Sequence, residues 1–236
     1  YEASSQRFIR GDIVHGTAGQ TTAIDRWKKF AYGILARNFA ALINKSSYSA
    51  DSVIKYCDLA MASGADDFLV PFDASRNEDA NWFGTFRNNI TELRQSDYIV
   101  RLLDGRVFTG NTLPANRDPR LRHMLTMTRI ADTTGSLNGG YRGVIPGSTL
   151  TNGTNLFGDS LTTNPGISNF AAPPGKYLFQ NKVVMPVMTY SEMQFMKAEA
   201  AFRKGDAGTA YTAYRNGING HFDFINRTSY PRGNVV

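Results

Sequence analysis

Apolar residues recur every three or four positions in a stretch near the start of the chain, AIDRWKKFAYGILARNFAALIN (23–44). This period places them on one face of an α-helix, and Trp27 falls on that apolar face. A second stretch with the same period begins at Ser49, a residue type that caps helices, and ends at Gly64, a residue type that stops them. Because few residues separate the two stretches, we expect an antiparallel helical hairpin over residues 23–64.

A second pair of helical stretches lies near the end of the chain, over residues 189–226. The first runs from a capping Thr189 or Ser191 to Gly205, and the next begins at Asp206. Small alanines recur in both stretches and let the two helices approach closely. An Ala-rich helix, a glycine at the turn, and Ala and Tyr four apart on the next helix are typical of a tetratricopeptide repeat.

The segment between the hairpins is less regular. Residues 78–130 have a helical pattern that is broken near Gly84, and Asp118-Pro119 is typical of the N-cap and first position of a short helix. Residues 131–181 are rich in Gly, Ser, Thr, Asn and Pro, with aromatic residues as anchors, so we expect an ordered loop-rich region there. The predicted fold class is all-α, with tetratricopeptide-like helix hairpins and a long irregular loop-rich subdomain.

Composition excludes several classes of protein. A chain of 236 residues can bury a sizeable core without staples, and the single Cys57 rules out an internal disulfide framework. Three widely spaced histidines do not make a metal site, so we expect neither metal nor cofactor. No stretch has the length of apolar sequence that a membrane span needs. The net charge is +6, but the positive residues are scattered, and we expect a solvated basic surface and no nucleic-acid partner.

No catalytic motif is present: the sequence lacks GxSxG, GxxxxGK[ST] and GxGxxG. Asp66 and Asp67 are adjacent and are expected to form a solvated turn, because a glycosidase needs two carboxylates that face each other across the substrate. Glu199 lies in the small-residue run AEAA, where a role in helix packing is the better interpretation. We therefore expect no catalytic residue and no enzyme.

With no catalytic motif present, aromatic and amide side chains are the remaining groups that could bind a ligand. Flat aromatic faces stack on the C–H surfaces of sugars, while Asn, Asp and Arg side chains hydrogen-bond the hydroxyls. One aromatic pair in the 78–130 segment is flanked by polar residues such as Asn81, and others lie in or next to the loop-rich region. The candidate ligand-binding residues are Trp82, Tyr141, Arg142, Asn152, Phe157 and Tyr177. For each of them the alternative is a purely structural role in fixing a long loop to the helices.

Four segments, in order and over nearly the whole chain, carry a family likeness: RWKKFAYGILARNFAALIN, SADSVIKYCDLAMASGADDF, NRDPRLRHML with the later YRG, and MPVMTYSEMQFMKAEAAFRKGDAGTAYTAYRNGI. Together they resemble the SusD/RagB family of outer-membrane nutrient-binding lipoproteins, and the last segment is the most specific. The resemblance implies a non-enzymatic protein on the surface of a Gram-negative bacterium. Such a protein delivers oligosaccharides or peptides to a SusC-like TonB-dependent transporter.

Family members are longer than this chain and begin with a lipoprotein signal. We therefore expect residues 1–236 to be a partial SusD-like domain, attached to the membrane only through a lipid anchor outside this sequence. The family's binding residues vary and lie mainly in loops, so the resemblance transfers no site motif.

The leading hypothesis is an oligosaccharide-binding or polysaccharide-binding surface lipoprotein. The alternatives are a tetratricopeptide-type interaction module without its own ligand site, a peptide-binding member of the same family, and an α-rich enzyme acting on glycosides.

Overall fold

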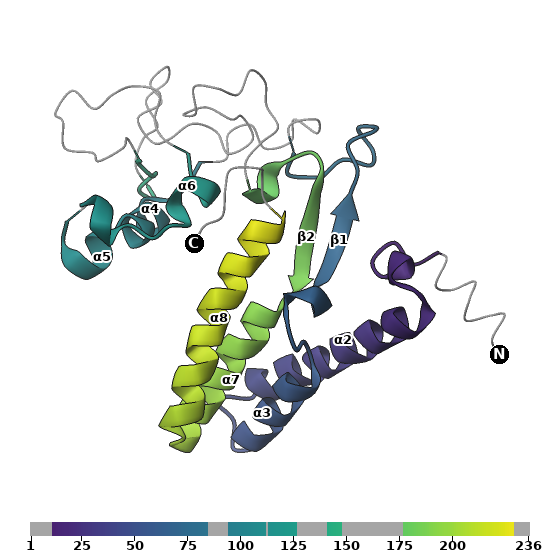
Figure 1. Ribbon diagram of the computed structural model, residues 1–236. Coiled ribbons are helices and arrows are strands. Elements are labelled where there is room, and N and C mark those ends of the chain that lie inside the picture. Colours follow the sequence, from purple (N-terminus) through teal and green to yellow (C-terminus); the bar gives the residue numbers. More distant parts are fainter. Residues whose placement is uncertain (1–10, 85–93, 112, 127–140, 148–176, 229–236) are drawn as a thin grey trace, which may run out of the picture. The chain divides into compact units, whose positions relative to one another are not determined.

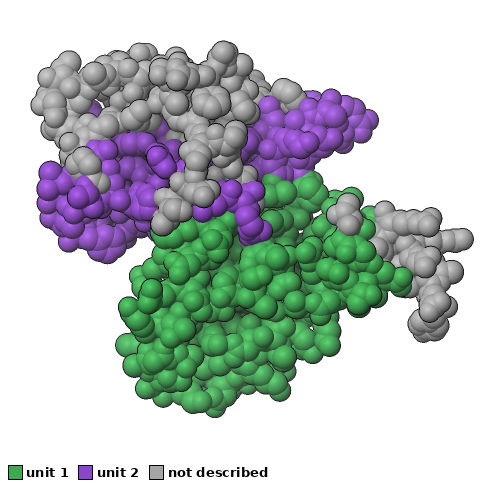
Figure 2. Space-filling model, in the orientation of Figure 1, with its two compact units in different colours: residues 1–71, 184–224 green, residues 72–183, 225–236 purple. Residues whose placement is uncertain are grey.

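The computed structural model describes residues 11–84, 94–111, 113–126, 141–147 and 177–228. These residues are mainly helical, with one two-stranded sheet, which confirms the predicted fold class (Figure 1). The sheet itself was not predicted. The chain forms two compact units (Figure 2): unit 1 comprises residues 1–71 and 184–224, and unit 2 comprises residues 72–183 and 225–236. Within the described ranges, no helix is long and apolar enough to cross a membrane.

Unit 1 carries both predicted hairpins. The first consists of α2 and α3, the second of α7 and α8, and α7 packs against α3 and α2. Strands β1 and β2 pair with each other, and two 3-10 turns, η1 and η2, complete the unit. The elements are η1 (Gly16–Ala18), α2 (Gln20–Ala41), α3 (Ala50–Leu59), η2 (Gly64–Asp66), β1 (Phe68–Phe72), β2 (Val183–Met188), α7 (Tyr190–Lys204) and α8 (Ala207–Thr228). The last residue of β1, the first of β2 and the last turn of α8 belong to unit 2.

An aromatic cluster fills the core between α2 and β1. Trp27 packs edge-on against Phe30 and Phe68, whose own rings stack with centroids 4.1 Å apart. The buried ring of His15 meets both Trp27 and Phe68 edge-on. The prediction that Trp27 belongs to the apolar core is therefore confirmed.

Polar contacts fix the start of α7 in unit 1. The guanidinium of Arg37 on α2 donates to both carboxylate oxygens of Glu192, at 2.6 and 2.7 Å, and to the carbonyl of Val187 at 2.5 Å. This bidentate geometry joins α2, β2 and α7. Asp67 is buried, and its carboxylate accepts the backbone N–H of Tyr190 at 2.6 Å. A helix leaves its first N–H groups without intrahelical partners, so the Asp67 carboxylate satisfies one of them.

The prediction that Asp66 and Asp67 form a solvated turn is wrong. Asp67 serves α7, and Asp66 accepts hydrogen bonds from Lys29 and from the backbone N–H of Ala62, each at 3.0 Å. Helix α3 ends at Leu59, before the predicted stop at Gly64, because the backbone of Ala60 is no longer helical, with φ of −78° and ψ of −130°. The N–H of Ala62 bonds the Asp66 carboxylate instead of a helical carbonyl, and Gly64 begins η2.

The other helix ends follow the sequence closely. The hydroxyls of Ser49 and Thr189 accept the N–H of Ser52 and Glu192, both at 3.2 Å, as N-caps. Gly205 ends α7 in the left-handed conformation, with φ of 86°, and the Asp206 carboxylate accepts the N–H of Thr209 at 3.0 Å.

Unit 2 contains only short described helices. They are α4 (Asp97–Leu103), α5 (Arg106–Thr109), η4 (Pro114–Asn116), α6 (Leu121–Met124) and η5 (Tyr177–Phe179). Residues 78–84 form turns, so the predicted helical pattern is wrong there, whereas residues 85–93 lie outside the described ranges. The short helix expected at Asp118-Pro119 begins at Leu121. The Asp118 carboxylate accepts the N–H of Arg120 at 2.9 Å, the kind of bond expected of a capping residue, and also pairs with the Arg120 guanidinium.

A buried amide organises the core of unit 2. The Gln95 side chain donates to the carbonyls of Thr126 and Arg142, at 2.7 and 2.6 Å, and accepts the N–H of Thr126 at 2.9 Å. Beside it, Ser96 and Val144 form a parallel bridge. A Cβ at Gly143 would lie 2.3 Å from the backbone nitrogen of Asp97. This crossing of two backbones therefore requires glycine.

We expect Gly143→Ala to break the bridge, because backbone atoms cannot move aside as a flexible side chain can. The free energy of unfolding should fall by about 1–3 kcal/mol or more. Hydrogen exchange at Asp97 and Val144, whose amides bond across the crossing, should accelerate. Gly208→Ala is the matched control: its Cβ meets nothing closer than 3.8 Å, and a helical alanine should be neutral or stabilising. Normal exchange at both amides in Gly143→Ala would contradict the prediction.

His15 makes the stability of unit 1 depend on pH. Burial lowers its pKa, Arg26 acts in the same direction, and the charges of Asp12 and Asp66 oppose them. Within the described residues, its Nε2 has no hydrogen-bond partner. Burial acts to raise the pKa of Asp12, but hydrogen bonds from Trp27 and from the N–H groups of Val14 and His15 outweigh it, and this pKa is lowered.

A lowered histidine pKa means that the unfolded chain binds the proton more readily. The contribution of neutral His15 is therefore complete above pH 6.5, its ordinary pKa, and is lost as the pH falls through the folded-state value. We expect the free energy of unfolding, measured by urea titration, to decrease from pH 7.5 towards pH 5, and to decrease less in His15→Phe. Equal pH dependence in both proteins would show that His15 is not responsible.

Candidate functional site

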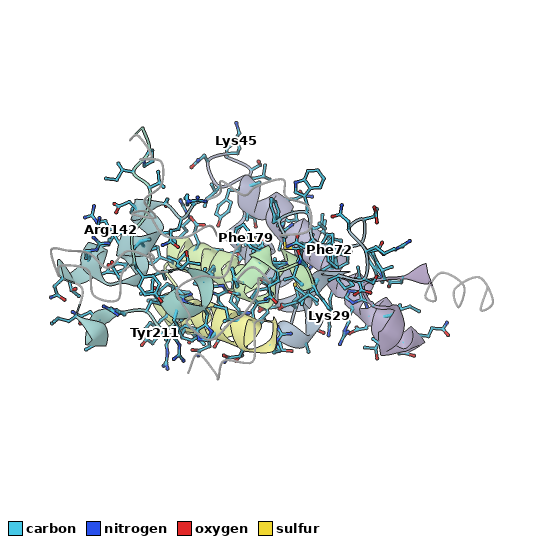
Figure 3. All side chains as sticks on the ribbon, turned by 90° about the horizontal axis from the view of Figure 1, so that it is seen from above. Lys29, Lys45, Phe72, Arg142, Phe179 and Tyr211 are labelled. Atoms are coloured by element: carbon cyan, nitrogen blue, oxygen red, sulfur yellow. The ribbon has the colours of Figure 1, made fainter. Side chains whose placement is uncertain are left out.

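Three aromatic residues of unit 2, here called the aromatic ledge, are the exposed Trp82 and Phe83 and the half-buried Phe179. Trp82 and Phe83 lie in the turn that ends at Gly84, and Phe179 is the last residue of η5 (labelled in Figure 3). The rings of Phe83 and Phe179 meet edge to face with centroids 6.2 Å apart. The Trp82 side chain is 56% exposed, so much of a large flat apolar surface faces solvent.

Hydrogen bonds of Asn81 join the two segments that carry the aromatic ledge. This residue is fully buried, and its amide donates to the carbonyls of Leu178 and Gln180, at 2.7 and 2.9 Å. Its backbone N–H donates to the carbonyl of Asn181 at 2.9 Å, while its side-chain oxygen accepts the N–H of Phe83 at 3.2 Å. Asn81 thus joins the turn that carries Trp82 to the segment that carries Phe179, although nearly a hundred residues separate them.

Two neighbouring features tighten the same connection. A Cβ at Gly84 would lie 2.9 Å from the Cα of Asn181, so the two segments approach as closely as they do only because residue 84 is glycine. Tyr177 has a φ of 53°, the left-handed region that is unusual for a large side chain. Burial raises the pKa of Tyr177 to about 12, with the charge of Arg120 opposing it, so the phenol keeps its proton at neutral pH.

The predicted site residues fall into three groups. Trp82 is in the ledge, and Tyr177 begins the η5 turn that ends in Phe179. Tyr141 is buried in the second core cluster, with α4 and α6 residues, and its ring packs there. Arg142 is partly exposed, and its carbonyl is one of the two that the Gln95 amide bonds. Asn152 and Phe157 lie outside the described residues.

The sequence analysis named the aromatic pair at residues 82 and 83, with Asn81 beside it, as a possible saccharide surface, but it did not include Phe179. The polar residues beside Trp82 were expected to meet sugar hydroxyls, whereas the Asn81 amide bonds backbone groups and faces no ligand. Nothing local signals this role. The aromatic character of residues 83 and 179 was visible in the sequence, but their pairing across the chain was not.

Two groups often used in catalysis are accounted for among the described residues. Among the described residues, no group of His, Cys, Asp or Glu could hold a metal ion. Burial raises the pKa of the Cys57 thiol to about 12, which makes it a poor nucleophile.

Comparison with solved structures identifies the fold. A SusD homologue from Bacteroides fragilis NCTC 9343 superposes with a TM-score of 0.65 at 19% identity, covering 95% of this chain and 45% of its own. A second SusD homologue from the same strain gives 0.60 at 18% identity, covering 92% and 44%. A chitin-binding protein gives 0.52 at 20% identity, covering 91% and 42%. The chain thus spans less than half the length of these proteins, and at such identities the likeness shows the fold alone.

No curated protein matches the sequence significantly. A family model does: SusD-like_2, described as starch-binding and associating with the outer membrane, matches residues 1–230. The family consists of binding proteins and not of enzymes, as the sequence predicted. Because this match covers nearly the whole chain and agrees with the helical fold, the chain belongs to the SusD-like family.

Proposed function

We propose that this chain is part of a glycan-binding protein of the outer-membrane surface, which passes oligosaccharides to a SusC-like TonB-dependent transporter. The family description supports a starch-like ligand and the outer membrane, and one structural relative is named as a chitin-binding protein. The lipid anchor and the transporter belong to this proposal, because the chain spans under half the length of its solved relatives.

We further propose that the aromatic ledge is a contact surface for the glycan. The observation that carries this proposal is the exposed Trp82 on a turn whose adjacent residue, Asn81, is fully buried and fully hydrogen-bonded. A mobile aromatic side chain would lose conformational freedom when a sugar stacks on it. A turn fixed by buried hydrogen bonds has already lost part of that freedom, which favours binding.

The other residues predicted to bind the ligand differ in how strongly the structure supports a contact with the glycan. Tyr177 lies two residues before Phe179 of the ledge, but the burial that raises its pKa to about 12 favours a structural role. Arg142 is partly exposed in the same unit, while burial of Tyr141 favours its structural role. Asn152 and Phe157 stay predictions that the same binding assay can test.

We expect Trp82→Ala to weaken glycan binding at least about fivefold, the effect of losing more than 1 kcal/mol at a contact that matters. Affinity electrophoresis in gels that contain starch, chitin-derived or other soluble polysaccharides measures this as reduced retardation. The matched control is Phe108→Ala, which removes an aromatic side chain that is 78% exposed on α5 of the same unit. Equal retardation of Trp82→Ala and the parent would exclude the ledge. Absence of retardation by every polysaccharide would favour the peptide-binding or protein-interaction alternatives.

We expect Asn81→Ala to weaken the same binding although Asn81 faces no ligand. The substitution leaves the carbonyls of Leu178 and Gln180 without their donor, at a cost of about 1–3 kcal/mol, and frees the turn that carries Trp82. Hydrogen exchange at Asn81 and Phe83 should accelerate together with the loss of retardation. The control Asn44→Ala, at an exposed position after α2, should change neither measurement. Weaker binding with normal exchange would instead indicate a direct contact by Asn81.

A further inference from the structure

The second hairpin of unit 1 carries an open apolar groove on its outer face. The groove has a volume of about 460 Å³ and runs between α7 and α8. Four aromatic side chains flank it, and Ala198 and Ala210 contribute small side chains between them. The aromatic residues are Phe195 and Phe202 of α7, and Tyr211 (labelled in Figure 3) and Tyr214 of α8. Phe202 is 75% exposed and Tyr211 is 65% exposed.

The hairpin beneath the groove is firmly built. The hydroxyl of Ser191 donates to the carbonyl of Gly217 at 2.6 Å, and the rings of Phe195 and Tyr214 meet with centroids 6.0 Å apart. A Cβ at Gly217 would lie 2.9 Å from the Phe195 ring, so glycine lets that ring pack directly on the α8 backbone. The groove is therefore a fixed feature of two well-packed helices.

The lining of the groove is mainly apolar. Besides the phenol hydroxyls of Tyr211 and Tyr214, the polar side chain that lines it among the described residues is that of Glu199, which forms an ion pair with Arg203 at 3.5 Å. An apolar surface with so few polar groups matches the apolar face of another protein segment.

The spacing of the lining residues matches a helix in particular. On α7 they recur at 195, 198, 199 and 202, and on α8 at 207, 210, 211 and 214, so each helix presents residues three and four apart. Such rows form ridges and grooves that accept the ridge of a third helix. Helix pairs of the tetratricopeptide type bury their apolar faces by stacking on neighbouring helices, and a pair without a neighbour leaves one face uncovered.

The length of the solved relatives indicates which segment could occupy the groove. They match 95% and 92% of this chain with only 45% and 44% of their own length, so more than half of each relative has no counterpart here. We propose that the α7–α8 groove is the seat of an amphipathic helix from a part of the same polypeptide that lies outside these 236 residues. The inference is independent of glycan binding at the aromatic ledge.

Thiol labelling tests the proposal, because the natural Cys57 is buried and barely reactive. Phe202→Cys is prepared in the 236-residue chain and in the longest polypeptide that its gene encodes. A control cysteine replaces Ser46, which is exposed in the turn after α2. We expect a maleimide to label both positions quickly in the short chain. In the long polypeptide, labelling at position 202 should be at least tenfold slower while labelling at position 46 is unchanged.

The labelling experiment gives a different result if the groove stays open or if a second copy of the chain occupies it. Equal labelling of position 202 in both polypeptides, including the case in which the gene encodes no further residues, overturns the proposal. Protection in the short chain that increases with protein concentration identifies a second copy of the chain and overturns it as well.

A photoreactive benzophenone amino acid at position 202 of the long polypeptide identifies the occupant. A crosslink to the same polypeptide, in a segment whose apolar residues recur every three or four positions, supports the proposal. A crosslink to a different protein, or to a segment without that period, contradicts it. Binding of polysaccharide at the ledge is measured separately, so failure of one proposal leaves the other testable.

Discussion

Strand β2 pairs with strand β1 although roughly 110 residues separate them in the sequence, and this pairing fixes where the chain re-enters unit 1. Polar contacts at the ends of the strands lock it. Asp67, just before β1, bonds the first N–H of α7, which follows β2, and Arg37 of α2 bonds both the end of β2 and Glu192 of α7. The returning chain therefore starts α7 at one place on the α2–α3 hairpin. Residues 72–183, which contain the aromatic ledge, begin and end at this paired strand.

In unit 2, too, polar side chains join segments that are distant in sequence, but here they are buried amides instead of a carboxylate and a guanidinium. Asn81 and Gln95 each bond backbone groups from segments distant in sequence. A buried amide must have its donors and acceptor satisfied, so its partners are confined to one geometry. In a unit with short helices and much irregular backbone, these two side chains provide order that regular secondary structure supplies elsewhere. The buried Asn81 therefore fixes the turn that carries Trp82, while the Trp82 side chain itself stays exposed.

The sequence predicts what depends on neighbours along the chain. The apolar period defines α2, α7 and α8, and the capping residues Ser49, Thr189 and Gly205 act as their residue types indicate. Prediction from the sequence fails where the structure depends on a residue far along the chain. Asp67 was expected at the surface because its hydrogen bond to Tyr190 is not visible in the sequence. In the same way, nothing in the sequence near β1 indicates that it pairs with β2. The same limit applies to the site. Trp82 and Tyr141 are both aromatic residues in polar surroundings, yet one is exposed and the other buried.

The discontinuous construction of unit 1 has a consequence for the protein as it is being made. When α2 and α3 have left the ribosome, α7, against which α3 packs, still lies roughly 130 residues further along the message. At about 5–20 residues per second, the apolar face of the first hairpin waits on the order of ten seconds for its partner. Transiently exposed apolar surface of this kind favours aggregation. The first hairpin is therefore most vulnerable in the interval before α7 is made.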